Sequence, residues 1–119
     1  MANEHIKTAA ANLQRAAQDV REEKHRLQNS INSMKRDAEN AIRKAEQQIM
    51  QLHQRLTDQN VDESMKIAAS LQQQNLRGDI AQIKKNTDQQ ERDLTQQING
   101  MDGQESEFES LASHLNNIA

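Results

Sequence analysis

The chain has 119 residues and a formal net charge of −3, and a single Phe is its one aromatic residue. This composition argues against a wide globular core, which aromatic side chains normally help to fill. The lack of Cys excludes disulfides and thiolate metal sites. No apolar run approaches the roughly 20 residues that cross a bilayer, so we expect no membrane insertion and a cytoplasmic location. Secretion by a route that needs no signal peptide stays open.

The first half of the chain carries an apolar stripe whose members are spaced alternately four and three residues apart. This spacing places them on one face of a helix and is typical of a coiled-coil seam, which needs a partner helix. The pattern predicts a helix over about 4–57. The stripe consists of Leu13, Ala17, Val20, Lys24, Leu27, Ile31, Met34, Ala38, Ala41, Ala45, Ile49, Leu52 and Leu56.

Four polar residues, 57–60, interrupt the stripe and predict a turn at 58–61. Asn60 and Glu63 have the spacing of a capping box, which indicates the start of a second helix. We expect this helix to run over about 62–99.

The second helix has a weaker seam. Its predicted interface residues are Leu71, Ile80, Ile83, Leu94 and Ile98. Asn75, Thr87 and Gln90 fall at or near seam positions, which suggests a buried polar layer that fixes register or partner choice. The alternative is that these residues face solvent, as expected for most of the amides in this chain.

Two glycines, Gly100 and Gly103, predict a break in the helix at 100–103. Asp102 precedes Glu105 by the distance that separates an N-cap from the third helical residue, so we expect a new helix there. This short third helix would span about 104–118 and present Phe108, Leu111, Leu115 and Ile118 on one face.

Charge divides unevenly along the chain. Residues 1–57 carry ten Lys/Arg and seven Asp/Glu, whereas residues 58–119 carry five and eleven. A fold-back near residue 60 would place the acidic stretch 102–109 beside Arg15 and Arg21. Opposite charge on facing helices selects antiparallel pairing more than it stabilises it. Pairing within one chain and pairing between chains both satisfy this pattern.

The residue patterns that could indicate a metal site or nucleic-acid binding are unspecific in this chain. Glu22 and His25 have the Glu-x-x-His spacing of helical di-metal sites, but one copy occurs and it falls on the solvent side of the seam. Two basic steps, 35–36 and 43–44, are interleaved with acidic residues and lack aromatic stacking partners. We therefore expect no catalytic site, no cofactor, no metal and no nucleic-acid binding.

Together these features predict an all-α fold: a long antiparallel coiled-coil hairpin with a short third helix, forming one elongated unit over 1–119. We expect it to oligomerise into a helical bundle. The predicted function is that of a non-enzymatic scaffold or adaptor that assembles with itself, with a larger protein assembly, or with both. The alternative is a small helical secretion factor, either a secreted hairpin or an export chaperone.

Overall fold

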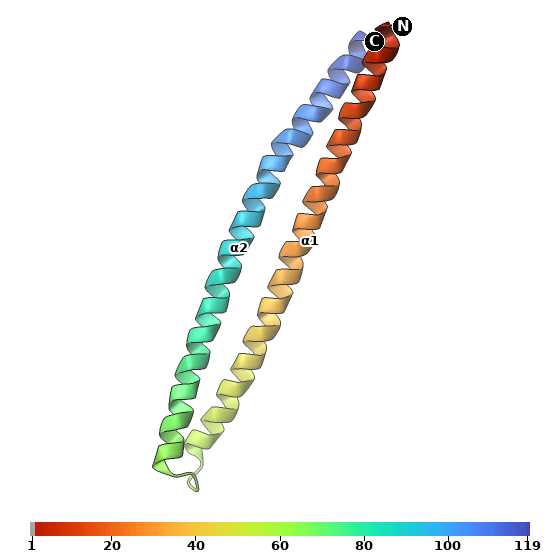
Figure 1. Cartoon of the computed structure of the whole chain (residues 1–119). Helices are drawn as coiled ribbons and strands as arrows, with labels where there is room; N and C mark the ends of the chain where they lie inside the picture. Colours follow the sequence, from red (N-terminus) through yellow and green to blue (C-terminus); the bar gives the residue numbers. More distant parts are fainter. Residues whose placement is uncertain (1) are drawn as a thin grey trace. The chain divides into compact units, whose positions relative to one another are not determined.

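The structure is a computed structural model that describes residues 2–119, and the side chains of residues 3–119. It contains two long helices, α1 (Ala2–Thr57) and α2 (Glu63–Ile118). No strand occurs in the described part of the chain (Figure 1). The all-α prediction and the fold-back near residue 60 are confirmed.

The connection between the helices is held by carboxylates. The Asn60 backbone N–H donates to Asp58 Oδ1 at 2.9 Å, which closes a short turn. The Met65 backbone N–H donates to Asp62 Oδ1 at 2.9 Å, so Asp62 is the N-cap of α2. The predicted cap at Asn60 is therefore wrong. Asn60 lies within the turn, and the cap must directly precede the first helical residue, Glu63.

The predicted break at 100–103 and the separate third helix are also wrong, because α2 continues through both glycines to Ile118. Within the described residues, no glycine has a positive φ, and a Cβ at residue 100 or 103 would meet no atom within 4 Å outside the adjacent helix backbone and chain neighbours. An exposed glycine inside a helix costs only about 1 kcal/mol relative to Ala. The side chains that continue the inward face across this segment are Ile98, Met101, Glu105 and Phe108.

The helices contribute to two compact units. The turn unit is Asn32–Gln90, in which the end of α1, the turn and the start of α2 form an antiparallel hairpin. The terminal unit consists of the described residues up to Ile31 together with Glu91–Ala119. In it the start of α1 lies beside the end of α2 (Figure 1).

Alanines form most of the buried core of the terminal unit and half of that of the turn unit. The buried residues are Ala10, Ala17, Ile31 and Ala112 in the terminal unit, and Ala45, Leu52, Ala69 and Gln73 in the turn unit. Among the described residues, no large side chain is fully enclosed. Each unit therefore buries one narrow seam, in which alanines allow close approach and longer side chains are half-buried around them.

The seam of α1 departs from the expected stripe at one point. Ala41 is exposed and Ile42 is half-buried. The inward positions therefore step by four from Ala38 to Ile42, then by three to Ala45. A larger apolar side chain is available one residue later, and burial of Ile42 in place of Ala41 removes more apolar surface from water.

Candidate functional site

Most of the predicted interface residues of the terminal unit lie between its two helical segments. Ile31 is 3% exposed, whereas Leu111 is 45% exposed and lies outside the seam, where Ala112 takes the buried place. The half-buried members are Leu13, Val20, Leu27, Leu94, Ile98, Phe108 and Leu115. These side chains pair α1 with α2 inside one chain, and their part in an interface with another chain stays a prediction.

The turn unit shows the same pattern with one exception. Leu52 is 8% exposed, but Leu71 is 56% exposed and points away from the seam. The half-buried members are Met34, Ile49, Leu56, Ile80 and Ile83. Leu71 is excluded because Ala69, Gln73 and Leu76 occupy the inward positions around it.

The most buried polar side chain of the turn unit is not one of the three expected from sequence. Asn75 and Gln90 are exposed and Thr87 is half-buried. Gln73 is instead 6% exposed, and its Nε2 donates a hydrogen bond to the Ile49 carbonyl oxygen at 3.0 Å. The sequence does indicate that Gln73 is a seam residue. Ala69, Gln73, Leu76 and Ile80 have the alternating four- and three-residue spacing of a seam.

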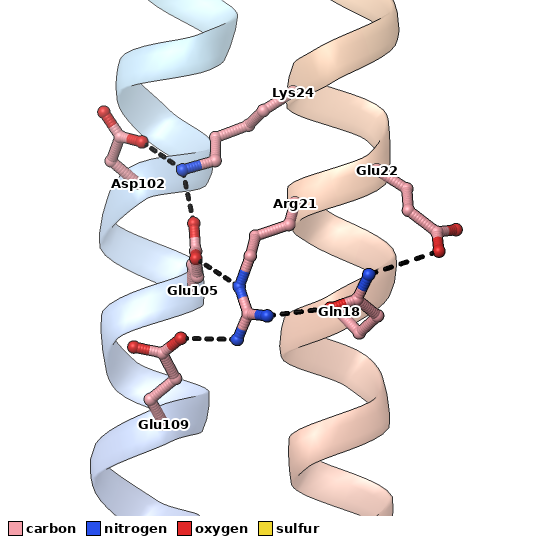
Figure 2. Close-up of polar contacts among 7 residues, drawn as sticks. All are labelled: Gln18, Arg21, Glu22, Lys24, Asp102, Glu105 and Glu109. Atoms are coloured by element: carbon pink, nitrogen blue, oxygen red, sulfur yellow. Dashed lines mark hydrogen bonds and ion pairs between the residues drawn. The ribbon is translucent and has the colours of Figure 1, made fainter.

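A cluster of charged side chains crosses the terminal unit (Figure 2). Arg21 Nε lies 2.7 Å from Glu105 Oε1, and Arg21 Nη2 lies 2.6 Å from Glu109 Oε1. Lys24 Nζ lies 2.6 Å from Asp102 Oδ1 and also pairs with Glu105. Arg21 therefore lies beside the acidic stretch, as its sequence pattern predicts, while Arg15 is not part of this cluster. The name charge cluster is used below for Arg21, Lys24, Asp102, Glu105 and Glu109.

Glu105 is the centre of the charge cluster. Its side chain is 14% exposed, and it occupies an inward position of α2 between Met101 and Phe108. Hydrogen bonds from Lys24 and then from Arg21 lower the pKa of Glu105, although desolvation opposes this shift. A carboxylate in an apolar seam is costly unless it is paired, and here two cations satisfy it.

The pKa values of the two cations of the charge cluster shift upward. Hydrogen bonds to Asp102 and then to Glu105 raise the pKa of Lys24. Those to Glu109 and then to Glu105 raise the pKa of Arg21. The ion pairs therefore favour the charged form of each of these groups, with partial burial working against them.

Gln18 supports the Arg21 side chain from the same helix (Figure 2). Arg21 Nη1 donates to Gln18 Oε1 at 2.7 Å, and Gln18 Nε2 donates to Glu22 Oε1 at 3.4 Å. Glu22 of the Glu-x-x-His spacing is thus engaged with an amide. Over the described residues, no group of three or more His, Cys, Asp or Glu side chains is arranged to hold a metal ion.

Two adjoining grooves run along one side of the turn unit, each with a volume of about 430 Å³. They share Arg55 and Gln72 as walls. Leu52 and Leu76 line one groove, and Met65 and Ala69 line the other. The remaining walls are mainly amides and short side chains, namely Gln48, Gln51, Asn75, Asp58, Val61 and Ala68. Such a lining suits a polypeptide surface that offers both apolar groups and hydrogen bonds.

Neither described helix contains a stretch long and apolar enough to cross a membrane. Comparison of the chain with protein-family models, with curated proteins and with solved structures gave no match.

Proposed function

We propose that this protein is a non-enzymatic scaffold or adaptor whose paired helices assemble, through coiled-coil packing, with further copies or with a larger protein assembly. The observation that carries the proposal is apolar surface left uncovered by the pairing of α1 with α2. Large apolar side chains in both units remain about half exposed or more, although each helix already has a buried face.

The uncovered surface is concentrated in the turn unit. Met50 is 65% exposed, Met65 56%, Ile67 58% and Leu71 56%. Complete burial of one such side chain contributes about 1.5–3 kcal/mol. Each of two copies contributes these four side chains, and about half of each side chain is still exposed. Their burial therefore contributes several kcal/mol, which is of the same order as the cost of association in lost freedom. This supports reversible assembly of moderate affinity.

The charge cluster supports a division of labour between pairing and assembly. Its ion pairs join α1 to α2 of the same chain. Because exposed ion pairs discriminate between arrangements more than they stabilise one, the cluster favours one antiparallel register within the chain. The apolar side chains of the turn unit are then available to other molecules.

Sedimentation equilibrium over a series from low micromolar to near-millimolar protein tests self-assembly. We expect the weight-average mass to rise with concentration towards a small multiple of 13.6 kDa. High salt should change this rise little, because apolar burial is not screened. A mass that stays at one chain over the whole range contradicts assembly with itself.

A further inference from the structure

The outward face of α2 in the turn unit carries an unusual stripe. Ile67 and Leu71 are four residues apart on the side of the helix opposite the buried Ala69 and Gln73, and they are 58% and 56% exposed. An exposed apolar pair at this spacing forms one continuous surface patch. Single exposed apolar residues are common, but adjacent ones on the solvent side of a helix indicate a contact surface.

Gly78 lies on the same face, seven residues after Leu71, and is exposed. Apart from the glycine, its chain neighbours and the adjacent helix backbone, no described atom lies within 4 Å of the position that a Cβ at residue 78 would occupy. Glycine is a poor helix former, so a glycine here weakens the isolated helix. It also leaves a hollow on the helix surface into which a side chain of another helix can fit. Ala81, also exposed, extends the low surface beyond it.

The stripe is self-complementary when read in opposite directions. If a second α2 lies antiparallel, with the two-fold axis between Gln74 and Asn75, then Leu71 of each copy faces Gly78 of the other. In the same register Ile67 lies opposite Gln82, with Ala81 beside it. Large side chains thus meet small ones in two symmetry-related places, as an isologous interface requires.

The charged residues at the two ends of the stripe fit the same two-fold symmetry. Glu63 lies at the start of the stripe and Lys85 at its end, and both are exposed on the same flank. In the antiparallel register Glu63 of each copy comes beside Lys85 of the other. A parallel arrangement would instead place like charges together. Charge complementarity therefore favours the orientation that also matches Leu71 to Gly78.

We propose that two copies of this chain pair through the outward face of α2 between Glu63 and Lys85, antiparallel, with Leu71 seated over Gly78. This proposal rests on the proposed function and specifies its surface, orientation and register. The contact spans about 33 Å of one helix face. A single helix face covers less area than a standard specific interface, so we expect a reversible dimer.

Gly78→Leu tests the hollow against Gly100→Leu as a matched control. Both glycines are exposed inside α2 with open space at the Cβ position, and both substitutions raise helix propensity. Sedimentation equilibrium should show dimerisation weakened about tenfold or more by Gly78→Leu, because the added side chain blocks the partner's Leu71. Gly100→Leu should leave the dissociation constant within about twofold of the wild type.

Charge reversal tests the register. Glu63→Lys and Lys85→Glu each place like charges together in a homodimer. An equimolar mixture of the two variants restores both attractive pairs, so the mixture should associate more tightly than either variant alone. Equal association of the mixture and the separate variants contradicts the register.

Spin labels test orientation, because separation along the axis grows by about 3 Å per residue from the two-fold axis of an antiparallel pair. Labels at Ser70 and at Asp88 lie on the same side of α2, five turns apart. In the proposed dimer the axial separation is about 13 Å for the first site and about 40 Å for the second. A parallel dimer gives equal separations.

The outcomes separate the two proposals. A wild type that remains a single chain at every concentration overturns this surface and assembly with further copies, and leaves an adaptor role in a larger assembly standing. A wild type that self-associates while Gly78→Leu dimerises as well as Gly100→Leu overturns this surface and leaves self-assembly standing.

Discussion

The terminal unit and the turn unit use the same two helices but differ in what crosses between them. Charged side chains cross the terminal unit, where Arg21 and Lys24 meet Asp102, Glu105 and Glu109. A neutral hydrogen bond from Gln73 to the Ile49 carbonyl crosses the turn unit. The terminal unit carries six Lys/Arg against ten Asp/Glu, and the turn unit nine against eight.

This difference separates two requirements of the scaffold role that we propose. Long-range charge patterns discriminate between registers of the chain's own helices, and the terminal unit carries that pattern. Uncovered apolar surface supports contact with other molecules, and the turn unit holds most of it: Met50, Met65, Ile67 and Leu71, against Leu111 and Ile118 in the terminal unit. We therefore expect disruption of the terminal unit to affect folding of the chain, and changes on the outside of the turn unit to affect assembly.

The largest expected effect is that of Ile31→Asp in the terminal unit. Ile31 is 3% exposed, so a carboxylate there loses its hydration in an apolar seam. We expect the free energy of unfolding to fall by about 3–5 kcal/mol, measured by urea denaturation followed by circular dichroism. Asn29→Asp, two residues away at an exposed position, is the control and should change it by less than about 0.5 kcal/mol. Equal losses would show that the seam has been placed on the wrong face.

A smaller effect is expected for Gln73→Ala in the turn unit. The substitution removes a hydrogen bond and leaves a small void, and together these should lower the free energy of unfolding by about 1–2 kcal/mol. Gln72→Ala is the matched control, because Gln72 is exposed on the groove side and should contribute less than about 0.5 kcal/mol. Gln73→Leu keeps the volume and removes the polar group, so it should recover most of the loss. A loss in Gln73→Leu as large as in Gln73→Ala would mean that the hydrogen bond itself holds the unit together.

The smallest expected effect is the pH dependence of the charge cluster. The pKa of Glu105 lies below its ordinary value of 4.5, so its stabilising contribution is complete above that pH and is lost as the pH falls through the lower, folded-state pKa. The pKa of Lys24 lies above 10.5, so its contribution is complete below that pH and is lost as the pH rises through the higher pKa. Stability should therefore form a plateau between these limits.

Thermal unfolding of Glu105→Gln against pH checks this prediction. The variant should show a lower midpoint than the wild type on the plateau and a shallower decline on the acid side, because one acidic group no longer titrates. Added salt should narrow the difference between the two proteins, since these groups are partly exposed. Parallel acid limbs in wild type and variant would show that Glu105 does not carry the pH dependence.

The sequence predicts the features that depend on the local spacing of apolar, polar and charged residues. The alternation of apolar residues from Leu13 to Leu56 was enough to predict α1, and four polar residues at 57–60 were enough to predict the turn. The uneven charge of the two halves predicted that Arg21 would meet the acidic stretch of α2. Each of these features is visible within one turn or one chain half.

The features that could not be predicted from the sequence depend on which of two neighbouring residues packs better against the facing helix. Gly100 and Gly103 suggested a break, but the ion pairs and the continuous inward face on both sides keep the helix intact. The choice of Gln73 over Asn75, and of Ala69 over Leu71, depended on the position of the facing helix. A small residue in the seam is hard to recognise, because apolar bulk dominates periodicity while close helix approach favours alanine.

Segment-resolved hydrogen exchange at two protein concentrations tests the division between the two units most directly. One concentration should lie below the association range found by sedimentation and one above it. We predict that backbone amides of 63–85 exchange more slowly at the higher concentration, whereas those of 102–112 are unchanged because their contacts lie within one chain. Slower exchange confined to 102–112, or spread equally over both segments, would contradict the assignment of assembly to the turn unit.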